Sequence, residues 1–323
     1  MTNQQSLLEV NELKKYFPIK KGILQRTKGY VKAVKNVTLQ VSEGETLGIV
    51  GESGCGKSTF GRTVIGLEKK TDGDIKFQGE NIGDLSDREL KKYKKDMQII
   101  FQDPFASLNP RQRIGDGLEE VLKIHTTLSK AEREQKVNEL LKEVGLKEEY
   151  KDRYPHQFSG GQRQRIGIAR AIALNPSLII CDEAVSALDV SVQAQIIKLL
   201  KDLQTTHDLT YLFISHDLGV VRHVSDRVMV MYLGTSAELG SSDQIYSNPL
   251  HPYTKALLSA IPRPIPGVKK ERVRLEGDIP SASEYPSGCP FHTRCPIAKA
   301  HCKESIPEWR EIEEGHFVAC HEV

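Results

Sequence analysis

The sequence predicts an α/β protein with an antiparallel β part near its N-terminus, an inserted helical subdomain and a C-terminal cysteine-rich tail. A glycine-rich loop at residues 51–59 follows an apolar strand at 45–50 and opens a helix at 57–67. Further apolar strands end in polar residues, and the stretch at 104–160 between two of them reads as helical. Four of the six cysteines fall within the last 35 residues. These patterns favour a phosphate-binding core followed by a separate tail.

The loop at residues 51–59 has the pattern G-x-x-x-x-G-K-S-T, which is typical of nucleotide hydrolases. Its glycines let the backbone turn several N–H groups toward the β- and γ-phosphates. Lys57 adds a charge that reaches the phosphate oxygens, and the Ser58 hydroxyl can coordinate Mg²⁺. The setting between a strand and a helix argues against a glycine-rich turn without function. The residues expected to hold the nucleotide here are Gly51, Ser53, Gly54, Cys55, Gly56, Lys57, Ser58 and Thr59.

Composition excludes several classes of protein. A chain of 323 residues has room for two or three domains. The net charge of +2 does not favour a nucleic-acid-binding protein, whose basic surplus is usually plain. Residues 1–10 lack the features of a signal peptide, and no apolar run approaches the roughly 18 residues of a membrane span. The chain is therefore expected to be soluble and cytosolic.

On the N-terminal side of the loop, short strands are expected at residues 7–10, 31–34 and 37–41. An aromatic residue between the first two could stack on a purine base, although an ordinary strand-end aromatic would leave the same pattern. Beyond the loop, strands are expected at 73–77 and 97–102. The last of these ends in a glutamine, Gln102, whose side chain would suit sensing of a γ-phosphate or its attacking water.

Residues 104–160 are expected to form the inserted helical subdomain. Ser129 and Glu132 have the spacing of a capping box, which marks the start of a helix. An apolar stripe follows at 137–144, and Gly145 stands where a helix C-cap belongs.

A second anion site is expected where Ser159, Gly160, Gly161 and Gln162 open the next helix. Free backbone N–H groups, a hydroxyl and the positive end of the helix would meet there. One nucleotide does not need two such sites from the same chain. The second site is therefore expected to serve a nucleotide held by another subunit.

The apolar strand expected at 177–183 ends in two acids. Asp182 would hold Mg²⁺, directly or through water, opposite Ser58. Glu183 is then placed to polarise the attacking water as the general base.

A turn and helix start are expected at residues 186–189, and a further strand at 209–214. His216 follows that strand and could hydrogen-bond the γ-phosphate. An isolated histidine at a strand end is more often structural, but this one follows the other motifs in order.

The order of these motifs resembles that of the nucleotide-binding subunits of ABC transporters, over about residues 7–245. The resemblance implies an ABC-type P-loop NTPase fold with ATP held between two such subunits. It also implies nucleotide contacts for Asp189 and Phe17, with Phe17 rather than Tyr16 stacking on the adenine, and a catalytic and Mg²⁺-linked role for Gln102. Phe158 replaces the usual leucine, and Ala184-Val185 stands where proline-threonine is common.

A narrower resemblance is to the oligopeptide/dipeptide importer branch, most similar to its OppF/DppF/AppF-type subunits. It is carried by residues 101–111, 154–157, 251–258 and 276–281. The resemblance implies a heterodimer with a second, OppD/DppD-type ATPase subunit, two membrane permeases and an external peptide-binding protein. It also implies a peripheral location at the cytoplasmic face of the cell membrane, with no nucleic-acid partner.

The cysteines of the tail have the spacing C-x5-C-x6-C-x17-C, which continues this resemblance. Four thiolates could bind zinc or a [4Fe–4S] cluster, but the paired knuckles of structural zinc sites are missing. The resemblance to this branch favours iron–sulfur, with zinc or free thiols as alternatives. The expected ligands are Cys289, Cys295, Cys302 and Cys320.

The sequence thus predicts an ATPase that drives peptide import, with a nucleotide-binding domain at residues 1–250 and a C-terminal extension at 251–323. Two alternatives are a soluble ABC ATPase not tied to a permease and an importer ATPase for another solute such as nickel. The motifs hardly separate peptide importers from importers of other small solutes.

Overall fold

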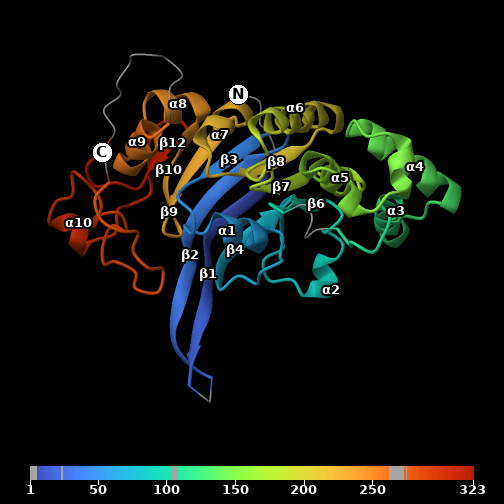
Figure 1. The fold of residues 1–323 in the computed structure, drawn as a ribbon. Coiled ribbons are helices and arrows are strands. Elements are labelled where there is room, and N and C mark those ends of the chain that lie inside the picture. The colour runs from blue at the N-terminus through green and yellow to red at the C-terminus, as the bar shows by residue number, and fades with distance from the viewer. Residues whose placement is uncertain (1–5, 23–24, 104–107, 262–272, 274) are drawn as a thin grey trace, which may run out of the picture. The chain divides into compact units, whose positions relative to one another are not determined.

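The computed structural model describes residues 6–22, 25–103, 108–261, 273 and 275–323 (Figure 1). It divides into two compact units. The first comprises residues 1–42, 46–84 and 215–323, and the second comprises 43–45 and 85–214.

The first unit contains the N-terminal strands, the phosphate loop and the tail. Its sheet has the strand order β5-β4-β1-β2-β10-β9-β3, and β12 pairs with β10 and with β11. Its elements are β1 (Ser6–Lys21), β2 (Arg26–Ser42), β3 (Thr46–Val50), α1 (Lys57–Val64), β4 (Asp72–Phe77), β5 (Glu80–Asn81), α7 (Leu218–Val224), β9 (Arg227–Tyr232), β10 (Thr235–Ser241), α8 (Ser242–Ser247), α9 (Pro252–Ser259), α10 (His301–Glu304), β11 (Arg310–Glu313) and β12 (His316–Val318).

The antiparallel β part consists of longer strands than the sequence analysis expected. β1 and β2 pair along almost their whole length as one hairpin, which extends beyond the other strands of this unit (Figure 1). Register shifts interrupt the pairing at several points. Such bulges let a strand continue through stretches without strict apolar alternation, so the apolar pattern marks only the buried portions.

β3 leads directly into the phosphate loop and is the last strand in the order of the first unit. All five of its residues are buried, and it pairs in parallel with β9, with Leu47 opposite Arg227 and Val50 opposite Val230. A strand that is buried on both faces reads as a continuous apolar run. This is why β3 was recognisable from the sequence.

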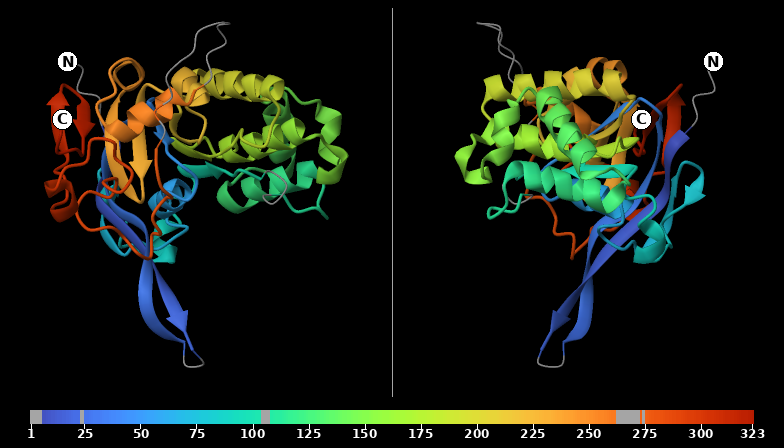
Figure 2. Two further views of the ribbon diagram at one scale, coloured as in Figure 1. Left: turned by 60° about the vertical axis from the view of Figure 1, so that its left-hand side comes forward. Right: turned by 90° about the vertical axis from the view of Figure 1, so that its right-hand side faces the viewer.

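The second unit contains three parallel strands in the order β8-β7-β6, with helices around them (Figure 2). α5 packs against β6 and α6, and α4 packs against α3 and α5. The elements are α2 (Asp87–Leu90), β6 (Met97–Ile100), α3 (Ile114–His125), α4 (Lys130–Glu143), the 3₁₀ helices η1 (Glu148–Asp152) and η2 (Pro155–Gln157), α5 (Gly160–Ile172), β7 (Leu178–Asp182), α6 (Val190–His207) and β8 (Thr210–Ile214).

The helix start and stop signals at 129–145 are confirmed. Ser129 accepts a hydrogen bond from the Glu132 N–H, and the Glu132 carboxylate accepts one from the Ser129 N–H. Gly145 follows α4 with a φ of +71°, and its N–H donates to Lys142 O.

A buried carboxylate joins the tail to β10. Glu238 is fully buried and accepts hydrogen bonds from the backbone N–H of Leu250 (2.7 Å) and of His251 (2.9 Å). It also accepts one from His316 Nε2 (2.8 Å), a residue of β12. A buried carboxylate needs such partners to remain in the interior, so these contacts hold the tail in place.

His251 makes this part of the fold sensitive to pH. Burial lowers its pKa to about 3, and its Nδ1 accepts a hydrogen bond from the Tyr253 N–H at the start of α9. A histidine whose pKa falls on folding stabilises the protein fully above its unfolded pKa of 6.5, and this contribution is lost as the pH falls toward 3. We expect the free energy of unfolding to drop by about 2 kcal/mol from this group between pH 7 and pH 5.

Denaturant unfolding at the two pH values measures this effect. His251→Asn keeps a hydrogen-bond acceptor near the Tyr253 N–H but cannot be protonated, so its stability should depend less on pH over this range. An equal drop in the variant and the wild type would remove His251 as the cause.

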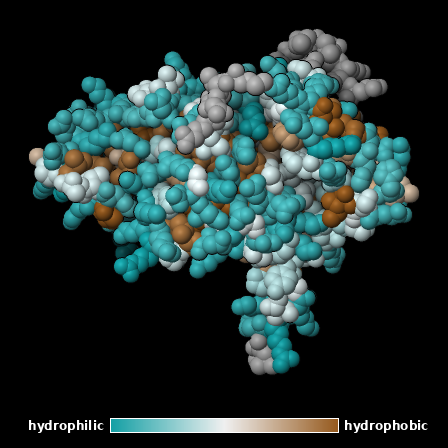
Figure 3. All heavy atoms as spheres, turned by 180° about the vertical axis from the view of Figure 1, so that it is seen from behind, coloured by the Kyte–Doolittle hydropathy of each residue, from teal (hydrophilic) through white to brown (hydrophobic). Residues whose placement is uncertain are grey.

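No helix in the described part of the chain is long and apolar enough to cross a membrane. On the face drawn in Figure 3 the surface is mainly hydrophilic, and apolar residues lie in separate patches.

Candidate active site

The phosphate loop connects β3 to α1 in the first unit, and two of its glycines lie where no side chain fits. A Cβ at Gly51 would stand 2.2 Å from Met231 O, and one at Gly56 would stand 2.1 Å from Ala33 O. Gly56 also has a φ of +105°, which residues with a side chain rarely adopt. The glycines therefore allow the loop to pass close to neighbouring backbone.

Lys57 lies inside the loop and is buried. Its Nζ donates hydrogen bonds to Gly51 O (2.8 Å) and to Glu52 O (3.1 Å). These two carbonyl groups, at the start of the loop, therefore hold the ammonium group of Lys57, which is the first residue of α1. A cation at the N-terminus of a helix, surrounded by backbone N–H groups, forms a site for a phosphate.

The other loop residues differ in exposure. Ser53 and Gly54 are exposed, while Ser58 and Thr59 are half-buried at the start of α1. Cys55 is buried, its pKa is raised by that burial, and a Cβ at Gly51 would meet its Sγ at 2.8 Å. The Cys55 thiol thus packs beneath the loop, which leaves only its backbone to face a ligand.

Glu52 is held by two residues that the sequence analysis did not single out. Arg294 donates two hydrogen bonds to its carboxylate, and the Tyr253 hydroxyl accepts one from its N–H. Arg294 stands 242 positions further along the chain. No local pattern in the sequence indicates such a contact.

His216 lies in the first unit, in the segment between β8 and α7. The neighbouring Ser215 donates its N–H to Ile49 O (3.1 Å), two residues before the loop begins. Asp217 caps α7 by accepting from the N–H groups of Gly219 and Val220. The His216 side chain is exposed between these two anchored residues.

The two acids at the end of β7 lie in different surroundings within the second unit. Asp182 is the last residue of the strand and is buried. Glu183 has a φ of +50°, which is uncommon for a residue other than glycine, and its N–H donates to Ile214 O (3.0 Å). Such a conformation persists where the surroundings hold it, often at functional sites.

The structure brings Gln102 and Glu183 together, although they stand 81 positions apart. Gln102 Nε2 donates to Glu183 Oε2 (3.1 Å). Ser186 Oγ donates to Glu183 O (3.0 Å). The Gln102 amide thus orients the Glu183 carboxylate through one of its oxygens.

The expected second anion site opens α5 as a complete capping box. Ser159 Oγ accepts from the Gln162 N–H (3.3 Å), and Gln162 Oε1 accepts from the Ser159 N–H (3.1 Å). The Ser159 hydroxyl uses a lone pair in this cap, so its O–H can still donate to a ligand. A Cβ at Gly161 would stand 2.5 Å from Val192 Cγ1, so close packing against α6 explains this glycine.

Asp189 is the N-cap of α6. Its carboxylate accepts from the Val192 N–H (3.0 Å) and from Ser191 Oγ (2.7 Å), and these hydrogen bonds lower its pKa. The expected helix start is therefore confirmed.

Phe17 and Tyr16 have different neighbours on β1. Lys15 Nζ lies 4.5 Å from the centroid of the Phe17 ring. Tyr16 instead lines a cavity of about 450 Å³, together with Tyr285 and Trp309 of the tail. One face of the Phe17 ring is therefore occupied by a cation.

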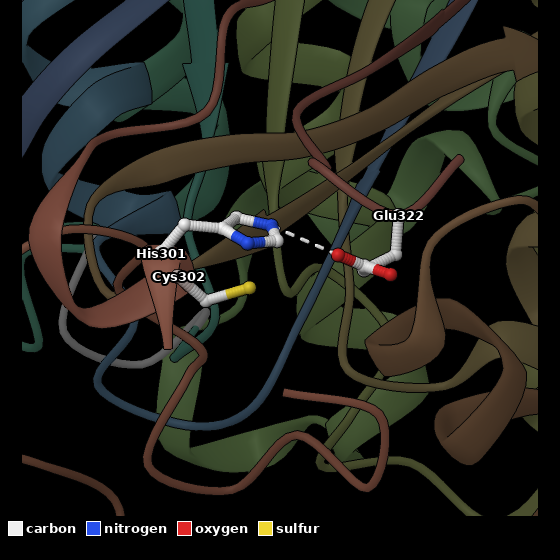
Figure 4. Close-up of side chains that lie close together, drawn as sticks. All are labelled: His301, Cys302 and Glu322. Carbon is white, nitrogen blue, oxygen red and sulfur yellow. Dashed lines mark ion pairs between the residues drawn. The ribbon is translucent and has the colours of Figure 1, made fainter. Parts of the chain in front are cut away.

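The structure does not gather the four cysteines of the tail into one set of ligands. All four are free thiols, and burial raises the pKa of Cys289 to about 11. Among the described residues, the group able to hold a metal ion contains only Cys302, together with His301 and Glu322 (Figure 4). His301 Nε2 already pairs with the Glu322 carboxylate (2.9 Å).

Two families match the sequence. The family described as "ABC transporter" matches residues 34–186, and the one described as "Oligopeptide/dipeptide transporter, C-terminal region" matches residues 237–302. Among solved structures, the dimeric ADP- and phosphate-bound cassette MJ0796 is 32% identical with a TM-score of 0.64, and covers 73% of this chain and 98% of its own. The structure of cbiO1 from Clostridium perfringens is 28% identical with a TM-score of 0.65, and covers 76% of this chain and 92% of its own. The fold and the phosphate loop thus define an ABC-type ATPase, a class that uses ATP and Mg²⁺.

Curated relatives match nearly the whole chain. The oligopeptide transport ATP-binding protein AppF of Bacillus subtilis is 58% identical over 99% of this chain and 98% of its own length. The dipeptide transport protein DppF of Haemophilus influenzae is 50% identical over 99% of both chains. OppF of Escherichia coli is 52% identical over 97% of this chain and 95% of its own. The chain therefore belongs to the ATP-binding proteins of the oligopeptide/dipeptide branch of ABC transporters.

This assignment confirms the predicted fold class and corrects one expectation. The predicted iron–sulfur cluster is wrong, because ABC ATPases carry no such cluster and the described part of the tail does not unite the four thiols. Zinc, the alternative, has no support from the relatives either. The spacing of the four cysteines was an insufficient signal, since spacing alone does not bring thiols together in space.

Proposed function

We propose that this chain is the ATP-hydrolysing subunit that powers import of oligopeptides or dipeptides across the cytoplasmic membrane. The observation that carries the proposal is the sequence identity to peptide-transport ATP-binding proteins, which extends over nearly the whole chain. Relatives named for oligopeptide and for dipeptide transport match this chain at 50% or more over nearly its full length. The match includes the C-terminal region, which a generic ABC ATPase does not need.

The phosphate loop fits the triphosphate of ATP. Gly51 and Gly56 allow a backbone path that a Cβ would block, and the Lys57 ammonium group already lies within the loop. In the proposed site, Lys57 leaves its carbonyl partners to bind phosphate oxygens, and Ser58 provides a ligand for Mg²⁺. When bound, Mg²⁺ neutralises charge on the phosphates. Phe17, whose ring lies beside the Lys15 ammonium group, stacks on the adenine.

The hydrolytic step uses positioned side chains without a covalent intermediate. Asp182 and Gln102 would also hold Mg²⁺, the former through its buried carboxylate. Glu183 accepts the proton of the attacking water, and His216 hydrogen-bonds the γ-phosphate. The Gln102–Glu183 hydrogen bond supports this role because it orients the base before water arrives.

The motif opening α5 acts on a nucleotide held by another subunit. Ser159, Gly160, Gly161 and Gln162 present a helix N-terminus, and Asp189 lies at the start of α6. The proposed partner is a second, OppD/DppD-type ATPase subunit in a heterodimer.

The remaining partners are two membrane permeases and, indirectly, an external peptide-binding protein. The chain would lie at the cytoplasmic face of the membrane, bound to the permeases. Residues 102–111 are proposed to receive a permease helix, and residues 104–107 of this stretch lie outside the described residues. The domain boundaries at 250 and 251 also stay a prediction.

A pull-down of the tagged full-length chain from native membranes in mild detergent tests the proposal. We expect mass spectrometry to identify two multi-spanning permeases and a second ATPase. Their binding protein can then be screened with peptides and with nickel to identify the solute. Recovery only with ribosomes or DNA would contradict the transporter function while leaving the ATPase assignment intact.

A further inference from the structure

We propose that the C-terminal extension positions the phosphate loop, and that Arg294 and Tyr253 are the positioning residues. The inference deepens the proposed function, because it rests on the loop binding ATP. All residues involved lie in the first unit.

Glu52, the second residue of the loop, is restrained at three points. Arg294 Nη1 donates to Glu52 Oε2 (2.6 Å) and Nη2 donates to Oε1 (3.0 Å), which forms a bidentate pair. The Glu52 N–H donates to Tyr253 Oη (2.9 Å), and Lys57 Nζ donates to Glu52 O (3.1 Å). The tail thus holds the side chain and the N–H of Glu52. The carbonyl of the same residue contacts Lys57, the lysine expected to bind phosphate.

The two tail residues are themselves firmly packed. Tyr253, Tyr232 and Phe291 are buried and form a cluster with ring centroids 4.8 to 5.3 Å apart. The Arg294 guanidinium lies 5.9 Å from the centroid of the Tyr232 ring, and its side chain is only 7% exposed. Burial of these rings restricts the positions open to Arg294 and to the Tyr253 hydroxyl.

Charge explains why such a restraint matters at this position. Glu52 carries a negative charge within the loop that must receive a polyanion, and the charge would repel phosphate if left unpaired. Arg294 neutralises it, and the hydrogen bonds to Glu52 raise the pKa of the guanidinium, which stays protonated. The fork of a guanidinium also fixes the orientation of the carboxylate, which a single ammonium does not.

The hydroxyl of Tyr253 restrains the backbone of the phosphate loop at Glu52. By accepting the hydrogen bond from the Glu52 N–H, it engages this donor and keeps the peptide plane in one orientation. The carbonyl on the other side of Glu52 then stays within reach of Lys57. Tyr253 therefore acts on ATP only through the shape of the loop.

Equilibrium binding of MgATP to the full-length chain tests the proposal, with Arg294→Gln, Arg294→Lys, Glu52→Gln and the double variant Glu52→Gln/Arg294→Gln. We expect Arg294→Gln to weaken ATP binding about ten-fold, because it leaves an unpaired carboxylate in the loop. Arg294→Lys should restore part of the loss, since it returns the charge without the fork. The double variant should return to within about two-fold of the wild type, because the unpaired charge is gone.

Tyr253→Phe separates the backbone contact from the charge. It keeps the ring in the aromatic cluster and removes only the hydroxyl, so we expect about three-fold weaker ATP binding with only a small drop in the unfolding temperature. Lys299→Gln is the matched control, because it removes a cation of the tail that pairs with Glu322 and is 65% exposed. The control should bind ATP like the wild type.

Three results would overturn the inference: wild-type ATP affinity in Arg294→Gln, no recovery in the double variant, or a loss shared equally by Lys299→Gln. If Arg294→Gln does not fold, the ATP affinity of Tyr253→Phe still tests the inference. Wild-type affinity in Tyr253→Phe would contradict the proposed restraint. Failure of the wild type to bind ATP at all would instead contradict the proposed function.

Discussion

Glu183→Gln should bind MgATP with near-normal affinity and hydrolyse it about 10²- to 10³-fold more slowly than the wild type. The substitution removes the group that accepts a proton from water and leaves an isosteric amide. Its side-chain oxygen can still accept the hydrogen bond from Gln102 that the carboxylate accepts now at 3.1 Å. The substitution should therefore lower the rate of ATP hydrolysis without lowering the affinity for ATP.

Single-turnover hydrolysis and equilibrium nucleotide binding measure the two quantities on the same preparation. Glu139→Gln is a matched control, since Glu139 lies on α4 and its carboxylate accepts a hydrogen bond from Gln135 of the same helix (3.0 Å). Turnover within about two-fold of the wild type in Glu183→Gln would remove Glu183 from the role of general base.

Lys57→Ala should abolish ATP binding at concentrations that saturate the wild type, which corresponds to about a 100-fold or greater loss of affinity. Lys57 is buried and its ammonium group is held within the loop, so the substitution removes a positive charge from the expected phosphate site. Glu183→Gln retains ATP without turnover, whereas Lys57→Ala loses the nucleotide itself. Equilibrium binding of a fluorescent ATP analogue checks the result.

Lys123→Ala controls for the loss of a lysine, because Lys123 is exposed in the last turn of α3. Unchanged thermal unfolding of Lys57→Ala would show that the loss is local. Wild-type affinity in Lys57→Ala would contradict the assignment of this loop as the ATP site.

Local features of the fold could be predicted from the sequence. The capping box of Ser129 and Glu132, the loop between β3 and α1 and the buried strand β7 each depend on residues that are close along the chain. Such features follow from spacing and apolar periodicity alone. The paired strands β1 and β2 were recognised only in part, because cross-strand pairing and bulges sustain them where the apolar pattern stops.

Contacts between distant positions could not be predicted. The hydrogen bond from Gln102 to Glu183 spans 81 positions, and the pair of Glu52 with Arg294 spans 242. Neither residue of the second pair belongs to a pattern that indicates its partner. For the tail cysteines the sequence pattern was misleading. Their spacing indicated a shared metal site, but the structure does not bring the four thiols together as one set of ligands.

The most direct test of the proposed function is ATP-dependent peptide uptake into proteoliposomes that contain the purified complex, with ATP enclosed and binding protein and labelled peptides outside. We expect peptide uptake that requires the enclosed ATP and that is lost when this chain carries Glu183→Gln. Peptide uptake that persists with Glu183→Gln, or ATP hydrolysis by the wild-type complex that moves no peptide, would contradict it.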